Sequence, residues 1–500
     1  MLDSKLRAYL ANINFFKPSW LATPNNETSW LVVFLATHVC IWVTAPTVGF
    51  LSPPLDVVEN LFWGREWLLG TYKHPPLQAW LTEIAWQTAG FMGVYALGQI
   101  CVSLTAAALF LFGKAVKSSL TGIVAALVFL LSFYGTLASI EPNANIISMP
   151  SWAFSGYFFW RIQTTNADKK SWWFWVGLSI SLSLAFYTKY SVAFLLIGLF
   201  FATISLPNGR RLLVQPEIYL AAALTILFCL PNLVWLFENQ FQPYQFAINR
   251  AGTVDTFQRF MNPLKFLAGV SFAFLIPLIV IIFSGGKLKR SSCNKEDTLF
   301  IYFISLVPLI AMALMSVVGG IGLKSMWGSS AAVWLPLLLA IHLTNPNKWQ
   351  RIGLGKIFIM FFALMLPLGA AFFSKYSEST NAPQRTGWNA PYLTKAALDG
   401  WHEQFVEPPR VVIGPTWEAG FVALFAPSRP TVLEDADYNK SPWVQPKIIR
   451  DYGALVVWSG NASRYSQLEP FLKKDSLAIW HKGKMIRFYW AVLPPVKNQS

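Results

Sequence analysis

The chain has 500 residues, of which 54% are hydrophobic and only 13% are charged. Soluble chains carry about 25% charged residues, and disordered, collagen-like and coiled-coil chains have other compositions, so all of these classes are excluded. In a soluble protein the net charge of +15 would suggest nucleic acid. In a membrane protein, cationic loops orient the helices and face anionic lipid. We therefore expect a polytopic α-helical membrane protein in contact with membrane lipid, with no nucleic-acid partner.

Apolar runs predict about 11 transmembrane helices, because a helix needs about 20 mainly apolar residues to cross a bilayer. A long apolar stretch after residue 172 is interrupted by Tyr187, Thr188 and Lys189, which predicts two helices joined by a tight turn. The expected spans are 30–50, 95–115, 120–140, 144–161, 172–188, 190–206, 216–236, 264–284, 297–317, 329–344 and 354–374.

Basic residues between the spans predict the orientation. With the N-terminus inside, the inner segments hold 17 Lys and Arg residues and the outer loops before residue 375 hold 7. This bias follows the positive-inside rule. An odd number of spans then places residues 376–500 on the outer side, as a periplasmic domain if the membrane is a bacterial inner membrane. Residues 1–375 form the transmembrane domain in this prediction.

The C-terminal segment, residues 376–500, has a different pattern. Short β-prone runs alternate with helical ones: 410–413, 431–433, 454–458 and 477–480 are predicted strands, and 416–425 is a predicted helix. Strands separated by helices indicate a small α/β domain.

The first outer loop, residues 51–86, is rich in Trp and too apolar for a mobile connection. We expect amphipathic helices at the membrane surface, divided by Pro53-Pro54 and Pro75-Pro76. Asp56 and Glu59 are three residues apart, so one helical turn presents both carboxylates on the same side. The plainer interpretation is that Asp56 only caps the helix. The cationic groups that follow in the same loop are Arg65, Lys73 and His74.

Four further outer segments carry ionisable groups: Glu141 in a turn with two asparagines, Lys189 between two spans, the broad loop 237–262, which is most simply a solvated connection, and Lys324 in a glycine-rich loop. The plainer interpretations are a polar turn and a lysine that extends its side chain to the membrane surface. Ionisable groups at a membrane are nevertheless functional candidates. The sequence contains no phosphate-binding P-loop, HExxH or paired CxxC motif, so ATPase, zinc-protease and redox chemistry are not indicated.

The segment 56–81, DVVENLFWGREWLLGTYKHPPLQAWL, resembles the first outer loop of polyprenyl-phosphate-sugar glycosyltransferases with the GT-C fold. These include protein mannosyltransferases of family 39 and lipid A aminoarabinose and galacturonic acid transferases. The shared pattern is an acidic start followed by Lys73-His74-Pro-Pro-Leu. The Thr-Lys-Tyr-Ser segment at 188–191 and the Lys-x-x-Trp of Lys324 and Trp327 also resemble this family. Two positions depart from it: Val57 replaces an acid, and Glu141-Pro-Asn-Ala stands where Pro-Asp-Ala is usual.

The resemblance implies an inverting transfer of a sugar from a polyprenyl monophosphate carrier to lipid A, another envelope glycan, a lipid or a protein. Asp56 is the expected base, with Glu59 as its partner or substitute. The remaining candidates contact substrate: Arg65, Lys73, His74, Glu141, Lys189, Lys324 and Trp327. Cationic side chains can stabilise a departing phosphate, so no cofactor is required. A divalent metal is compatible with this chemistry but not implied by it.

Three other functions fit parts of the sequence. A transporter or flippase of lipid-linked sugars would share the helices and cationic loops, but polar residues would be expected at the bilayer midplane. A structural membrane protein leaves the 56–81 segment unexplained. A polymerase or ligase that uses a diphosphate-linked donor is disfavoured only by the resemblance around Lys73.

Overall fold

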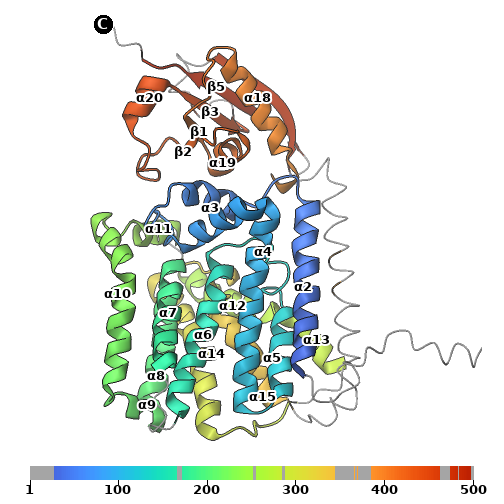
Figure 1. Ribbon diagram of the computed structural model, residues 1–500, viewed down its shortest axis with the longest axis vertical. Coiled ribbons are helices and arrows are strands. Elements are labelled where there is room, and N and C mark those ends of the chain that lie inside the picture. Colours follow the sequence, from blue (N-terminus) through green and yellow to red (C-terminus); the bar gives the residue numbers. More distant parts are fainter. Residues whose placement is uncertain are drawn as a thin grey trace, which may run out of the picture.

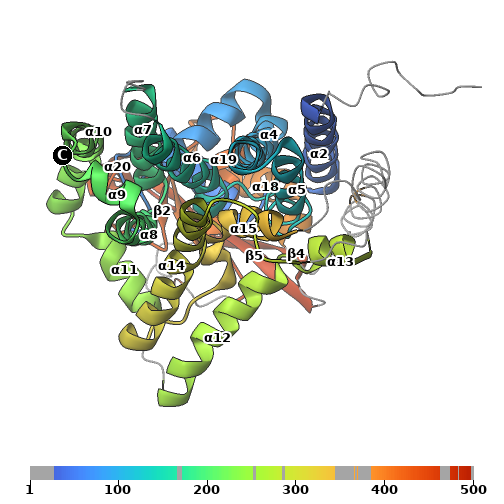
Figure 2. The same cartoon turned by 90° about the horizontal axis from the view of Figure 1, so that it is seen from below.

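The computed structural model describes residues 27–165, 172–251, 255–283, 288–343, 365, 369, 385–461, 465, 473–481 and 484–496. Figure 1 shows a bundle of helices with a small sheet domain at one end. We call the described residues 385–496 the C-terminal domain. Seen from below, α15 lies near the middle of the bundle, between α5 and α14 (Figure 2). Their bounds are α5 Ser119–Leu130, α14 Lys295–Gly319 and α15 Leu335–His342.

Within the described residues, four helices are long and apolar enough to cross a membrane: α2 (Glu27–Gly49), α4 (Leu77–Val116), α10 (Pro216–Glu238) and α14. A bent pair at an angle of 49° would make a fifth span. This pair is α12 (Thr256–Phe272) and α13 (Leu275–Phe283). The remaining helices of the bundle are α6 Ala144–Thr164, α7 Trp172–Thr188, α8 Val192–Ser205, α9 Pro207–Leu212, α11 Gln242–Ala251, and the 3-10 helices η2 Ser325–Gly328 and η3 Ala331–Trp334.

Some of the expected spans agree with the helices of the structure and others differ from them. The tight turn around Lys189 is confirmed, since α7 ends at Thr188 and α8 begins at Val192. The span 120–140 is wrong in its second half, because α5 ends at Leu130 and turns follow. The span 329–344 is shorter, divided between η3 and α15. The span 354–374 lies almost entirely outside the described residues, and the count of 11 stays a prediction.

The two proline pairs of the first outer loop begin helices, as predicted. Pro54 precedes α3 (Leu55–Arg65) and Pro76 precedes α4. Proline suits these positions because its missing N–H is not needed in a first helical turn. The location of α3 at the membrane surface stays a prediction, but its apolar side is not open to lipid. Trp63 and most other residues of α3 are buried, because the C-terminal domain covers this helix (Figure 1).

The C-terminal domain contains a five-stranded sheet in the order β2-β1-β3-β5-β4. β1 pairs in parallel with β2 and β3, and β5 is antiparallel to β3 and β4. The predicted strands and the helix after β1 are confirmed, whereas β5 was not predicted. The bounds are η5 Arg385–Gly387, α18 Ala390–His402, β1 Val411–Gly414, α19 Thr416–Phe425, β2 Thr431–Glu434, α20 Pro446–Tyr452, β3 Ala454–Ser459, β4 Lys473–His481 and β5 Lys484–Leu493.

The C-terminal domain and α3 share one hydrophobic core. Val58, Phe62 and Trp63 pack together with side chains of α18, α19 and the sheet. The approach of α19 to α3 is so close that a Cβ at Gly420 would overlap Val58. At the edge of this contact, Arg429 forms two hydrogen bonds, of 2.6 and 2.9 Å, with the fully buried Glu83 of α4. The domain is therefore fixed on the helices that carry the first outer loop.

Candidate active site

A cavity of about 590 Å³ lies between α3, the turn before α6, the turn after α7, the η2 segment and the C-terminal domain. Every predicted site residue except Arg65 lines it. Its polar and charged lining residues are Asp56, Glu59, Lys73, His74, Glu141, Asn143, Asn145, Lys189, Lys324, Arg385 and Thr386. Loops that are distant in sequence therefore meet in one cavity.

Asp56 stands in the first turn of α3, but it does not cap the helix. The N-cap is Pro54. The Asp56 carboxylate instead accepts a 2.8 Å hydrogen bond from Nδ2 of Asn143, and its backbone N–H donates to Oε1 of Glu141 at 3.0 Å. Asn143 is itself the N-cap of α6 and accepts from two backbone N–H groups there. The start of α6 thus fixes the orientation of the Asp56 carboxylate.

Glu59 and Lys73 form an ion pair in the same cavity. Burial raises the pKa of Glu59 to about 8, and the Lys73 ammonium acts in the opposite direction. Lys73 also lies against three aromatic rings, with Nζ 5.2 Å from the centroid of Tyr72 and 5.6 Å from those of Trp63 and Phe246. Cation–π contacts and the carboxylate hold this ammonium in one place.

Glu141 and Lys189 approach Asp56 from turns at the end of the bundle that faces the C-terminal domain. Burial raises the pKa of Glu141 to about 8, and the Asp56 carboxylate adds to the rise. Burial lowers the pKa of Lys189 to about 8, against the attraction of Asp56. Lys189 Nζ donates a 2.6 Å hydrogen bond to Oδ1 of Asn145. A carboxylate, a weakly ionised carboxyl group and a cation therefore meet at one point, which is suited to proton transfer beside an anion.

Lys324 and Trp327 reach the cavity from the segment between α14 and η2. Gly320 ends α14 in the left-handed conformation, with φ of 64°, which glycine adopts without steric cost. The chain then turns so that the exposed Lys324 precedes η2. This turn brings a cation to the cavity wall.

Three residues that sequence reasoning missed enter the cavity from the C-terminal domain: Arg385 and Thr386 of η5 and Trp417 of α19. The Arg385 guanidinium lies 4.5 Å from the ring centroid of Trp417 and 5.2 Å from that of Trp388. No local pattern distinguishes these residues, since their role depends on how the domain docks. Asn143 and Asn145 were recognised only as part of a polar turn.

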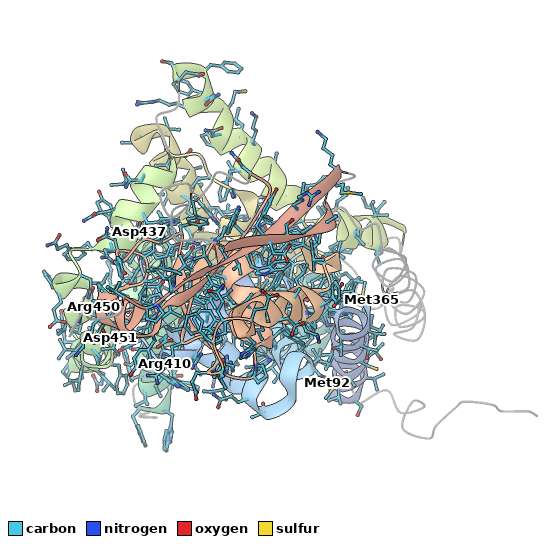
Figure 3. The ribbon with its side chains drawn as sticks, turned by 90° about the horizontal axis from the view of Figure 1, so that it is seen from above. Met92, Met365, Arg410, Asp437, Arg450 and Asp451 are labelled. Atoms are coloured by element: carbon cyan, nitrogen blue, oxygen red, sulfur yellow. The ribbon has the colours of Figure 1, made fainter. Side chains whose placement is uncertain are left out.

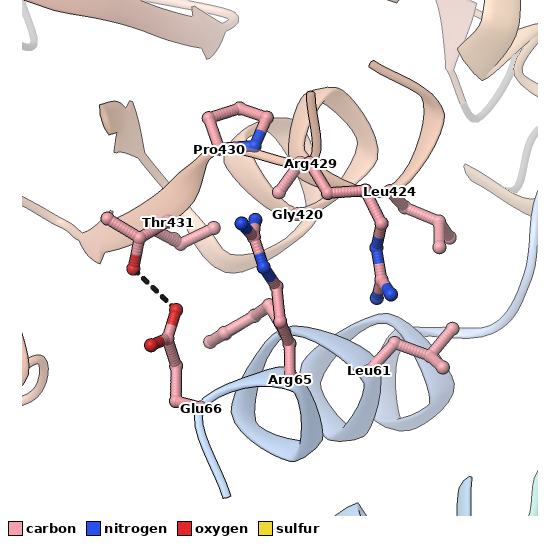
Figure 4. A pocket seen from close by; sticks show the side chains of 11 residues that line it. Leu61, Arg65, Glu66, Gly420, Leu424, Arg429, Pro430 and Thr431 are labelled. Atoms are coloured by element: carbon pink, nitrogen blue, oxygen red, sulfur yellow. Dashed lines mark hydrogen bonds between the residues drawn. The ribbon is translucent and has the colours of Figure 1, made fainter. Parts of the chain in front are cut away.

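Arg65 is not brought to this cavity. It lies at the far end of α3, where Figure 4 shows it beside Arg429 and Pro430 of the C-terminal domain. The neighbouring Glu66 accepts a 2.7 Å hydrogen bond from the hydroxyl of Thr431. Arg65 therefore belongs to the contact between α3 and the C-terminal domain. Among the described residues, no group of three His, Cys, Asp or Glu side chains is arranged to hold a metal ion.

Comparison of the sequence with known families and proteins agrees with this geometry. The family model described as dolichyl-phosphate-mannose-protein mannosyltransferase matches residues 73–235. The chain is 24% identical to a lipopolysaccharide core galacturonosyltransferase of Rhizobium johnstonii, RgtB, over 86% of this chain and 87% of that protein. It is 22% identical to the lipid A galacturonosyltransferase RgtD of the same organism, over 64% of this chain and 69% of that protein.

The fold is also similar to that of a solved structure. ArnT from Cupriavidus metallidurans, in a crystal structure with undecaprenyl phosphate bound, superposes with a TM-score of 0.61 at 13% identity, over 92% of this chain and 98% of that one. The apo form of the same protein gives the same TM-score. The predicted GT-C membrane fold and the predicted relationship to glycosyltransferases are confirmed.

Proposed function

We propose that this membrane-embedded glycosyltransferase moves a sugar from a polyprenyl monophosphate carrier, such as undecaprenyl phosphate, to lipid A or another envelope glycan. The reaction would take place at the outer face of a bacterial inner membrane, where the cavity, the first outer loop and the C-terminal domain lie together. The observation that carries the proposal is the cavity itself, because it combines an oriented carboxylate with several cations at one end of the bundle.

In this proposal Asp56 is the general base. The acceptor hydroxyl oxygen forms a bond to the anomeric carbon while the bond from that carbon to the phosphate oxygen breaks. The hydroxyl proton passes to the Asp56 carboxylate, and the polyprenyl phosphate leaves with an additional negative charge. Direct displacement on one face inverts the configuration at the anomeric carbon. A positioned base contributes about 10²- to 10⁴-fold to such a rate.

The cations of the cavity stabilise the departing phosphate. Lys324 is exposed in the cavity wall and Lys189 lies near Asp56, so these two ammonium groups are suited to the charge that develops. Lys73 is already paired with Glu59. It would contribute a fixed contact to the phosphate, although the Glu59 carboxylate partly neutralises its positive charge. His74 and Trp327 line the same space and complete the donor site.

The donor is tested with purified protein in detergent. A polyprenyl monophosphate sugar and the corresponding nucleotide sugar are each offered with a lipopolysaccharide acceptor, and product is measured by mass spectrometry. We expect transfer from the lipid-linked donor. Transfer from the nucleotide sugar alone would contradict the proposal. Mass spectrometry of envelope lipids from cells with and without the gene then identifies the acceptor.

A further inference from the structure

Arg385 is the charged residue that the C-terminal domain contributes to the cavity, and the mechanism above does not use it. Its side chain is 26% exposed and its Nη2 lies 3.3 Å from Oε1 of the buried Glu418. The guanidinium also lies close to the rings of Trp388 and Trp417, which restrict its position. A guanidinium has five N–H donors in a rigid fork, so an anchored one is prepared for recognition of a carboxylate.

The turn that carries Arg385 is joined directly to the residues that lead into α3. The backbone N–H groups of Leu51 and Ser52 both donate to the carbonyl oxygen of Thr386 at 3.0 Å. The Ser52 hydroxyl donates to the carbonyl oxygen of Trp388 at 2.5 Å and accepts from the backbone N–H of Ala390 at 3.2 Å. Asp56 follows Ser52 by four residues. These hydrogen bonds therefore fix the turn of Arg385 relative to the chain segment that carries the proposed base.

The charge of the substrate explains why another cation is useful there. A sugar linked through a phosphodiester carries one negative charge, and a second develops on the phosphate as the bond breaks. Lys189 and Lys324 match these two charges in the proposed mechanism. Arg385 lines the same cavity in addition. Like Lys73 it is already paired with a carboxylate, Glu418, so it would act as a fixed, forked contact for a further anionic group on the substrate.

We propose that Arg385 is a specificity residue that binds the carboxylate of an acidic donor sugar, so that the transferred group is a hexuronic acid. This inference rests on the proposed function. The C6 carboxylate is attached to C5 of the ring that contains the anomeric carbon. The anomeric carbon must lie near Asp56, and Arg385 is fixed to the chain that leads into that residue. A phosphate of the acceptor is the competing source of negative charge.

The test compares two lipid-linked donors that differ only at C6: polyprenyl phosphate galacturonic acid and polyprenyl phosphate galactose. Each is offered with native acceptor and with acceptor treated with phosphatase. A charge-assisted fork contact predicts about a 10- to 100-fold preference in kcat/KM for the acidic donor. Arg385→Gln should reduce this ratio to near one, and Arg385→Lys should leave an intermediate ratio, because Lys keeps the charge but not the fork.

Two further variants separate recognition from folding. Arg385→Gln alone leaves Glu418 buried without its cation, so Arg385→Gln combined with Glu418→Gln removes both partners and should show the same loss of preference. Arg410→Gln is the matched control. Arg410 also stacks on an aromatic ring, 3.5 Å from the centroid of Tyr452, but it lies on the outer side of the C-terminal domain (Figure 3). The control should keep the wild-type ratio.

The possible outcomes distinguish a role of Arg385 in donor specificity from a structural role and from a role in acceptor binding. Equal use of both donors by the wild type, or an unchanged ratio in Arg385→Gln, would overturn the assignment of Arg385 while leaving the proposed function intact. An equal loss with both donors would mean a structural role, and a loss that appears only with phosphorylated acceptor would assign Arg385 to the acceptor. Absence of transfer from either lipid-linked donor would overturn the proposed function itself.

Discussion

Replacing Asp56 by asparagine separates proton transfer from structure at this site. The amide oxygen of the new side chain can still accept the hydrogen bond from Asn143, which is 2.8 Å long in the wild type. The bond from the backbone N–H to Glu141 is unaffected, and the helix keeps its N-cap at Pro54. The variant should therefore insert and fold normally. It lacks only the basicity that would take a proton from a hydroxyl group.

The expected loss is about 10²- to 10⁴-fold in kcat at saturating donor, which corresponds to about 3 to 5 kcal/mol in the activation barrier. KM for the donor should change little, because the donor phosphate contacts cations. The measurement is single-turnover transfer by purified protein. Asp255→Asn is the matched control, since Asp255 caps α12 through a 2.7 Å bond to the backbone N–H of Gln258 and is exposed.

Near wild-type turnover in Asp56→Asn would refute the reasoning. Glu141 would then be the next candidate base, since its raised pKa suits proton transfer near neutral pH. An equal loss of kcat in Asp255→Asn would instead indicate that both substitutions act by destabilising the start of a helix and not through proton transfer.

Three further outcomes follow from the site. The ordinary pKa of a glutamate is 4.5, but the folded protein retains the proton on Glu141 up to a pH of about 8. The stability that this raised pKa contributes is therefore complete below pH 4.5 and is lost as the pH rises to 8. Glu141→Gln should thus unfold at a higher temperature than wild type at pH 9 and at the same temperature at pH 4, and the opposite order would contradict burial of this group. Lys73→Ala should weaken use of the lipid-linked donor and destabilise the protein by about 3 to 5 kcal/mol, as measured by thermal unfolding. Glu59→Gln in the same chain should restore stability but not donor use, and a single variant as stable as wild type would show that the pair is not effectively buried. In intact cells an impermeant thiol reagent should label Asn439→Cys but not the native Cys293 at the other end of the bundle, and the reverse pattern would invert the topology.

The sequence predicted the parts of the site whose signals are local. Proline pairs fix where α3 and α4 begin, so the spacing of Asp56 and Glu59 on one turn could be inferred before any contact was known. The polar break around Lys189 predicted the turn that carries it to the cavity. These inferences hold because each depends on only a few neighbouring residues.

Arg65 and Arg385 mark where local reasoning fails. Arg65 is near Asp56 in sequence, but it lies at the other end of α3, so the helix itself carries it away from the cavity. Arg385 is more than three hundred residues from Asp56 and has no distinguishing motif. Its position depends on hydrogen bonds between its turn and the chain before α3, which only the docked C-terminal domain provides.

The C-terminal domain therefore forms part of the site. Besides Arg385, it holds the loop of Lys73: the Tyr72 hydroxyl donates to Oε1 of the buried Glu434 at 2.9 Å, and Thr416 donates to the same oxygen at 2.6 Å. Because Tyr72 precedes Lys73 and its ring lies against the ammonium, a shift of β2 would be transmitted to that lysine. A domain fixed by a shared core and a buried ion pair is suited to this positioning, since catalytic geometry depends on rigid support.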